Sequence, residues 1–195
     1  MTTLEYYNQN AEVFVQGTFH ADMQEHYDRF LPYLPDRARI LDLGCGSGRD
    51  TLFFLQKGFS VVPVDGSSEV CKEAEKMIGF SVRCLRFEDL DYHNEFDGIW
   101  ACASLLHVPK ADILGIMNKV ADALKPNGAL YASFKYGSGE GIKGERFFNY
   151  YKEDFIDSVL PFAGFSCKEY WISNDVRPDR HEEKWLNLIA IKGLE

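Results

Sequence analysis

Residues 40–50, which read Ile-Leu-Asp-Leu-Gly-Cys-Gly-Ser-Gly-Arg-Asp, constrain the fold more than any other part of the chain. An apolar run precedes glycines at alternate positions, and residues that can start a helix follow them. This order predicts a buried strand, a tight turn and a helix N-terminus. A turn without Cβ atoms lets a ligand approach the backbone closely, and a helix N-terminus offers it unpaired N–H groups. We therefore expect the turn to bind a small molecule.

The spacing of the glycines helps to identify that molecule. The dinucleotide fingerprint G-x-G-x-x-G would place a third glycine at position 49, where this chain has Arg49. Asp42 would repel a pyrophosphate, whereas it would attract a cationic amino group. The next predicted strand, residues 60–65, ends in Asp65, where a carboxylate can accept hydrogen bonds from two ribose hydroxyls. The pattern thus favours a nucleoside that carries an amino group over a dinucleotide.

Through these residues, the sequence resembles the class I S-adenosylmethionine (SAM)-dependent methyltransferases, and the resemblance covers about residues 6–190. In length and in residues 100–109 it is similar to small bacterial methyltransferases of the tellurite-resistance type. The resemblance implies SAM as the cofactor. It implies that the amino-acid part of SAM lies on Asp42, Gly44, Cys45, Gly46 and Gly48. It places the ribose at Asp65, Gly66 and Ser67, and Ala101 beneath the methionine.

The adenine site follows the third predicted strand and stays open in its details. Members of the family usually hold the adenine amino group with an acid at this point. In one plausible alignment with the family's motif, Arg86 stands at the position of this acid. Either Glu88 or Asp89 then takes that role, or a backbone amide near Phe87 does. A solvated acidic turn is the alternative interpretation of Asp89.

Strands and helices alternate along the rest of the chain. We expect further strands at 81–85, 96–101, 129–134, 165–172 and 185–191, and helices at 49–56, 69–77, 110–124 and 153–163. Residues 135–146 contain four glycines and predict a mobile loop. The alternation predicts an α/β fold, Rossmann-like and doubly wound, with a mostly parallel seven-stranded sheet whose last strand is antiparallel.

Residues 1–34 precede the first strand, and their apolar spacing predicts two helices. They form either a helical cap that buries one side of the sheet or a lid over the cofactor. Under the second interpretation Tyr7 contacts SAM. We expect a single methyltransferase domain over residues 1–195, with a SAM-binding core at 38–192.

Composition excludes several function classes. The chain has 195 residues, enough for one domain, and a net charge of −9. An acidic chain without a basic tract argues against a nucleic-acid substrate, and no apolar run approaches membrane-spanning length. Five scattered cysteines predict reduced thiols in the cytoplasm, and no motif predicts a metal site. The oligomeric state, monomer or dimer, stays open.

Ligands of such sheets bind beyond the carboxyl ends of the strands, which gives candidates for the substrate site. His107 is expected there, either as a base or as a hydrogen-bonding contact. Lys135, Arg146 and Arg177 also fall on this edge and predict an anionic small substrate, although ordinary solvated loop charge is the alternative. Two rival functions are an NAD(P)-binding oxidoreductase and a catalytically silent SAM-binding regulatory module.

Overall fold

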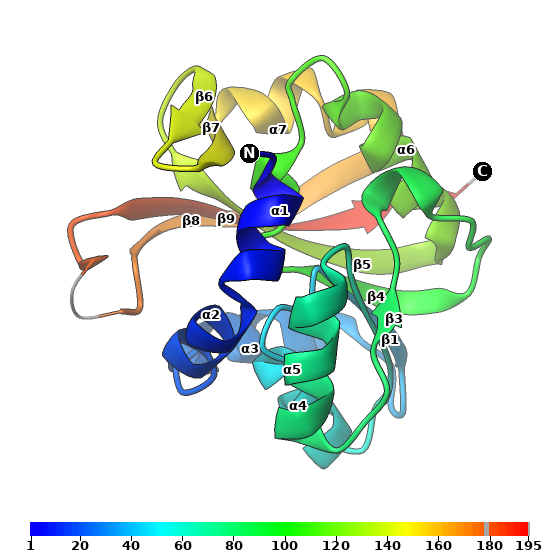
Figure 1. The fold of residues 1–195 in the computed structure, drawn as a ribbon. Coiled ribbons are helices and arrows are strands. Elements are labelled where there is room, and N and C mark those ends of the chain that lie inside the picture. Colours follow the sequence, from blue (N-terminus) through cyan, green and yellow to red (C-terminus); the bar gives the residue numbers. More distant parts are fainter. Residues whose placement is uncertain (178–179, 195) are drawn as a thin grey trace.

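The computed structural model describes residues 1–177 and 180–194, whose strands form one twisted sheet with helices on both faces (Figure 1). Its strands are β1 (Arg39–Leu43), β2 (Ser60–Asp65), β3 (Arg83–Cys84), β4 (Phe96–Ala101), β5 (Leu124–Tyr136), β6 (Glu140–Lys143), β7 (Arg146–Tyr151), β8 (Phe165–Asn174) and β9 (Lys184–Lys192). Its α-helices are α1 (Thr3–Gln9), α2 (Ala11–Thr18), α3 (Gln24–Phe30), α4 (Arg49–Gln56), α5 (Ser68–Ile78), α6 (Ile113–Ala123) and α7 (Asp154–Ser158). Short 3₁₀ turns η1 (Leu31–Tyr33), η2 (Phe87–Asp89), η3 (Leu105–His107) and η4 (Pro161–Ala163) complete the described elements.

The strand order confirms the predicted fold class. Strands β3, β2, β1, β4 and β5 are neighbours in that order, and all four pairs are parallel. Strand β9 pairs antiparallel with β5, and β8 pairs antiparallel with β9. These seven strands form the predicted sheet, and the carboxyl ends of the five parallel strands meet at one edge. The predicted third strand is shorter than expected, because only two of its residues pair with β2.

A hairpin adds two strands that the sequence interpretation did not include. Residues 135–146 were expected to form a mobile loop, but β6 and β7 pair antiparallel within and beyond that range. Gly144, with φ +64°, sits in the two-residue connection between the strands, where a left-handed backbone lets the chain reverse. The end of β7 pairs with the end of β5, so the hairpin extends the sheet at its carboxyl edge. The loop prediction is therefore wrong for most of this segment.

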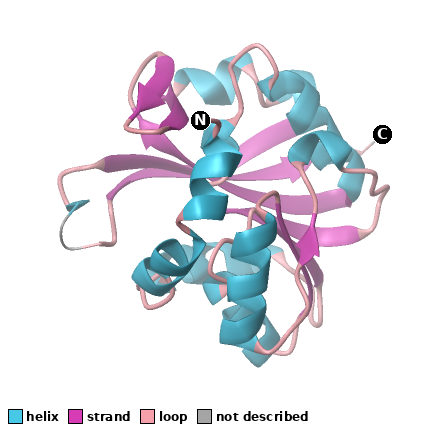
Figure 2. Cartoon of the chain, viewed as in Figure 1, coloured by secondary structure: helices cyan, strands magenta, loops and turns pink. Residues whose placement is uncertain are grey.

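Alternation along the strands explains why both faces of the sheet are covered (Figure 2). On β1, Leu41 and Leu43 join the core cluster that includes α6 and α7, whereas Ile40 joins the cluster that includes α3 and α4. Because successive strand residues point to opposite faces, a strand with apolar residues on both faces needs a helical layer on each side.

Two helices differ from their predicted bounds. Helix α6 begins later than expected, at Ile113, and the predicted helix at 153–163 is divided into α7 and η4 before Pro161.

The N-terminal segment forms three α-helices instead of the predicted two, and they do different things. Helix α3 packs on the sheet, where Phe30 is fully buried beside Trp100, as expected of a cap. Helices α1 and α2 contact α5 instead, through residues such as Val15 and Val70. Figure 1 shows α1 between the β6–β7 hairpin and α2, in front of the carboxyl edge of the sheet. Whether α1 acts as a lid remains a prediction.

Candidate functional site

The glycine turn connects β1 to α4 and is held against the end of β2. The backbone N–H groups of Gly44 and Cys45 both donate to the carbonyl oxygen of Val64, at 2.9 Å. Gly44 has φ +78°, and a Cβ atom there would lie 2.4 Å from the Cβ of Ser104. The turn therefore requires glycine at this position both for its backbone conformation and for its packing.

Asp65 ends β2 and links the glycine turn to the start of α5. One of its carboxylate oxygens accepts a hydrogen bond from the N–H of Gly46 at 3.0 Å, and the other accepts one from the N–H of Ser67 at 2.9 Å. Burial raises the pKa of this carboxyl group, and the hydrogen bonds from backbone N–H groups lower it. Each oxygen keeps a second lone-pair direction, so the carboxylate can accept two further hydrogen bonds from a ligand.

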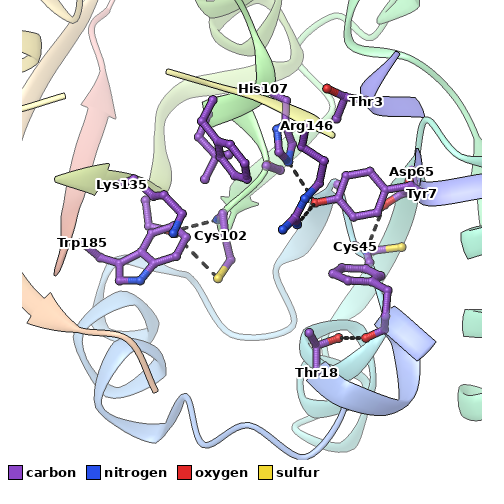
Figure 3. A pocket seen from close by; sticks show the side chains of 18 of the residues that line it. Thr3, Tyr7, Thr18, Cys45, Asp65, Cys102, His107, Lys135, Arg146 and Trp185 are labelled. Atoms are coloured by element: carbon purple, nitrogen blue, oxygen red, sulfur yellow. Dashed lines mark hydrogen bonds between the residues drawn. The ribbon is translucent and has the colours of Figure 1, made fainter. Parts of the chain in front are cut away.

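Asp65 and the glycine turn border a cavity of about 440 Å³ at the carboxyl edge of the sheet. Figure 3 shows Asp65, Tyr7 and Arg146 on one side of this cavity and Lys135, Trp185 and Cys102 on the other. The predicted site residues that line it are Tyr7, Gly44, Cys45, Gly46, Asp65, Gly66, Phe87, Glu88, His107, Lys135, Arg146 and Arg177. The predicted site residues that do not line it are Asp42, Gly48, Ser67, Asp89 and Ala101.

Three of the five residues outside the cavity lining have structural partners of their own. Asp42 is buried behind the turn, where it accepts a hydrogen bond from the Thr51 hydroxyl at 2.5 Å. Burial, together with the negative charge of Asp50, raises the pKa of Asp42, which weakens its expected attraction for an amino group. Gly48 precedes α4, and a Cβ there would lie 2.8 Å from the Ile78 side chain. Ser67 caps α5 by accepting a hydrogen bond from the N–H of Val70.

The side chains of the other two residues, Asp89 and Ala101, do not line the cavity. Asp89 is exposed at the end of η2, and Ala101 is fully buried at the end of β4. The roles of all five in cofactor binding remain predictions.

His107 takes part in a chain of hydrogen bonds that joins three segments far apart in the sequence. Its Nδ1 lies 2.7 Å from the carbonyl oxygen of Phe147, and its Nε2 lies 3.0 Å from the Tyr7 hydroxyl. Because a carbonyl oxygen only accepts, Nδ1 carries the hydrogen and Nε2 accepts from Tyr7. Arg146 in turn donates to the Tyr7 hydroxyl at 3.2 Å. The chain fixes the imidazole and connects α1 to η3 and β7 (Figure 3).

Burial, reinforced by the nearby positive charges of Arg146 and Lys135, lowers the pKa of His107 to about 4. Its usual value is near 6.5, so between these values the unfolded chain binds more protons and the folded protein loses stability as pH falls. Between pH 7.5 and pH 5.0, we expect wild type to lose about 2 kcal/mol more of its free energy of unfolding than His107→Gln does. Urea denaturation at both pH values measures this. His93→Gln, an exposed site, should behave like wild type, and equal losses in wild type and His107→Gln would contradict the assignment.

Positive side chains around the cavity differ in how they are paired. Lys135 contacts the carboxylate of Glu183, and burial lowers the pKa of Lys135 to about 8. Arg177 is paired with Asp175 at 2.6 Å. Arg146 is different: its guanidinium lies over the rings of Tyr6, Tyr7 and Phe148. Within the described part of the chain, no carboxylate forms an ion pair with it.

A buried ion pair in the cavity wall was not predicted from the sequence. Arg49 donates to both carboxylate oxygens of Asp50, at 2.7 and 2.9 Å, and the indole N–H of Trp100 donates to the same carboxylate at 2.8 Å. The Tyr27 hydroxyl also donates to it. Burial raises the pKa of Asp50, but the charge and hydrogen bonds of Arg49 outweigh it, so the pKa lies below its usual value. Only the apolar spacing of α3 and the helix start at Arg49 were visible in the sequence, and neither indicates this pairing.

Two absences apply to the described residues. No helix in them combines the length and the apolar character needed to cross a membrane. Nor do three or more histidine, cysteine or acidic side chains among them gather closely enough to hold a metal ion.

Comparison with known proteins adds family information to this geometry. Residues 40–128 match the family model described as "Methyltransferase domain". A Bacillus subtilis protein named as a methyltransferase, YqeM, is 29% identical over 64% of this chain and 55% of its own length. The ubiquinone biosynthesis O-methyltransferase of Nitrobacter winogradskyi is 36% identical over 49% of this chain and 38% of its own length. The chain thus spans about half, or less, of the length of these curated relatives.

Similarity of structure extends over nearly the whole chain. The 1,6-didemethyltoxoflavin-N1-methyltransferase of Burkholderia thailandensis, solved with 1,6-didemethyltoxoflavin and S-adenosylhomocysteine, superimposes with a TM-score of 0.75. The match covers 98% of this chain and 85% of that chain at 22% sequence identity. At this identity the similarity establishes the fold.

Proposed function

The chain carries a class I SAM-dependent methyltransferase domain, and from this premise we propose that it transfers a methyl group from SAM to a small molecule with an anionic group. The cofactor of such a domain is SAM. The observation that best supports an anionic acceptor is Arg146, a cation in the cavity wall without a carboxylate partner among the described residues. The names of two similar proteins, which refer to ubiquinone biosynthesis and to toxoflavin, support a small molecule as the acceptor.

The cavity has features that fit SAM. The hydroxyl of Ser104 is buried beside Gly44, lines the cavity and has no hydrogen-bond partner among the described residues. A buried hydroxyl without a partner destabilises the protein unless a ligand or water satisfies it, and the amino-acid end of SAM offers both donors and acceptors. Asp65 would accept the ribose hydroxyls, and Phe87 and Glu88 would flank the adenine. These assignments rest on the lining of the cavity and on the family resemblance.

Methyl transfer asks the protein mainly for positioning. SAM supplies an activated methyl group on a positively charged sulfur, which leaves as a neutral thioether when the acceptor attacks in line. Holding two reactants in the reactive geometry contributes about 7–11 kcal/mol to such a reaction. In this chain the residues of the cavity wall would orient the acceptor, and α1 with Tyr7 would exclude water. His107 fits a positioning role, because its Nε2 is already bonded to Tyr7.

Two rival functions make different predictions. An NAD(P)-binding oxidoreductase would use a third glycine at position 49, but Arg49 stands there and pairs with Asp50. A catalytically silent SAM-binding module would bind SAM and S-adenosylhomocysteine but would form no methylated product. Calorimetry with S-adenosylhomocysteine and with NADH distinguishes a methyltransferase from the oxidoreductase. A turnover assay distinguishes it from the silent module.

The substrate proposal predicts the effect of replacing Arg146. Incubation with methyl-labelled SAM and a set of small carboxylic acids should yield S-adenosylhomocysteine and a labelled acid. For the acid that reacts, Arg146→Gln should raise KM at least tenfold, because a charge-assisted hydrogen bond is lost, and should leave the Kd of S-adenosylhomocysteine unchanged. Arg83→Gln, exposed and outside the cavity, is the matched control. Binding without turnover of any acid would favour the silent module, and an unchanged KM would remove Arg146 from the proposal.

A further inference from the structure

His26 lies in the wall of the cavity, although its position on α3 gave no sign of this. The residue lines the cavity and is only 4% exposed. No group of the described residues forms a hydrogen bond with its Nδ1. Burial lowers the pKa of His26, so the imidazole is neutral near pH 7 and offers one N–H donor and one bare nitrogen.

Most of the neighbouring polar groups bond to one another. The exception is the indole N–H of Trp171, whose ring stacks on His26 at 5.7 Å and which also has no partner among the described residues. Asn187 accepts from the Tyr131 hydroxyl at 2.9 Å and donates to the Ser173 hydroxyl at 2.9 Å. Ser133 accepts from the N–H of Ala103 at 2.8 Å. Nδ1 itself is closed off from the cavity. Nε2, the other ring nitrogen, also forms no hydrogen bond with the described residues and is not closed off, so Nε2 is the nitrogen that a ligand in the cavity can reach.

The surface that leads away from His26 follows the end of the sheet. Tyr131, Ser133 and Lys135 alternate along β5 and therefore point to the same face. On β9, Asn187 pairs with Ser133, and Trp185 pairs with Lys135. With about 3.3 Å of rise per strand residue, this row spans about 13 Å from Tyr131 to Lys135. The ring of His26 lies 6.1 Å from the ring of Tyr131, at the first end of the row.

The opposite end of the row is cationic. The ammonium group of Lys135 lies 5.2 Å from the Trp185 ring and 5.5 Å from the Phe148 ring. The guanidinium of Arg146 lies 5.0 Å from the same Phe148 ring. The cavity therefore runs from a neutral histidine, along aromatic and small polar side chains, to two cationic side chains. Lys135 is paired with Glu183, and Arg146 has no carboxylate partner among the described residues. A flat molecule with an acidic group at one end and a hydroxyl or ring N–H at the other matches this sequence of groups.

We propose that His26 is a specificity residue that hydrogen-bonds the hydroxyl or ring N–H of an aromatic acid lying along β5, with its carboxylate toward Lys135 and Arg146. This inference rests on the proposed function, because it identifies the class of methyl acceptor. A site built to bond a hydroxyl discriminates strongly against the analogue that lacks it, since the Nε2 atom of His26 then stays without a partner in the occupied cavity.

The proposal is tested by binding measurements with two acids that differ only in hydroxyl groups. Calorimetry with protein saturated in S-adenosylhomocysteine should show that 3,4-dihydroxybenzoate binds at least tenfold more tightly than benzoate. In His26→Phe, which keeps a ring and removes both nitrogens, the ratio should fall below twofold while the Kd of benzoate stays within twofold of wild type. His26→Gln, which keeps a polar group if the first variant folds poorly, should retain an intermediate ratio. His93→Phe, an exposed site outside the cavity, should keep the tenfold ratio.

The outcomes separate this proposal from the one on which it rests. If wild type binds both acids equally, or binds neither, the proposal for His26 is wrong. It is also wrong if His26→Phe keeps the tenfold ratio. If S-adenosylhomocysteine itself does not bind, the proposed function fails instead. The His26 variants should leave the Kd of S-adenosylhomocysteine unchanged in every case.

Discussion

Replacing Asp65 with alanine is expected to weaken the binding of S-adenosylhomocysteine at least 100-fold. The carboxylate would lose its bonds to two ribose hydroxyls, and hydrogen bonds to a charged group contribute about 1.5–3 kcal/mol each. The same substitution would leave the N–H groups of Gly46 and Ser67 without their acceptor, so the glycine turn would also be less well held. Isothermal titration calorimetry of both proteins measures the change.

Asp91→Ala provides the matched control for this prediction. Asp91 is an exposed acid whose side chain does not line the cavity. Its replacement should change the Kd of S-adenosylhomocysteine less than threefold. A comparably small effect of Asp65→Ala, in a variant shown to be folded, would contradict the placement of the ribose.

The largest effect on stability is expected at Asp50. Its carboxylate accepts hydrogen bonds from Arg49, Trp100 and Tyr27. Trp100 and Tyr27 are buried, and the side chain of Arg49, which borders the cavity, is 18% exposed. Asp50→Ala would leave the mostly buried guanidinium of Arg49 without a partner, and breaking a buried ion pair in this way destabilises a protein by about 3–5 kcal/mol. Urea denaturation at pH 7.5 should show a loss of that size in the free energy of unfolding.

A double variant distinguishes this charge effect from a simple loss of packing. Adding Arg49→Met to Asp50→Ala removes the unpaired positive charge and should restore at least about 1 kcal/mol of the free energy of unfolding. Asp36→Ala, an exposed acid, should change stability by less than about 0.5 kcal/mol. A loss below about 1 kcal/mol in Asp50→Ala would show that the ion pair is not important for stability.

The fold could be predicted from the sequence because its signals are local. The glycines after residue 43 require a turn, and Asp65 follows an apolar strand. The missing helix between β8 and β9 correctly implied an antiparallel pair. The β6–β7 hairpin was missed because four glycines were interpreted as a loop. The aromatic run of β7 and the turn glycine Gly144 were the available signals for it.

Residues at or near the end of a strand were the most readily predicted part of the site, although Tyr7 on α1 was also predicted and lines the cavity. Asp65 and Lys135 lie at or near strand ends, so the topology of the sheet brings them to one cavity. His26, by contrast, reaches that cavity through the packing of α3 on the sheet, which no local pattern encodes. Gly48 shares the spacing of the other turn glycines, yet its environment is the side chain of Ile78. Sequence spacing shows that a residue is near a turn, whereas three-dimensional packing decides which way it faces.

A crystal structure of the complex with S-adenosylhomocysteine tests the central claim most directly. We expect electron density for the ligand in the cavity, with both ribose hydroxyls within hydrogen-bond distance of the Asp65 carboxylate and the amino-acid end against Gly44 and Ser104. A ribose bound elsewhere, or a ligand outside this cavity, would contradict the account.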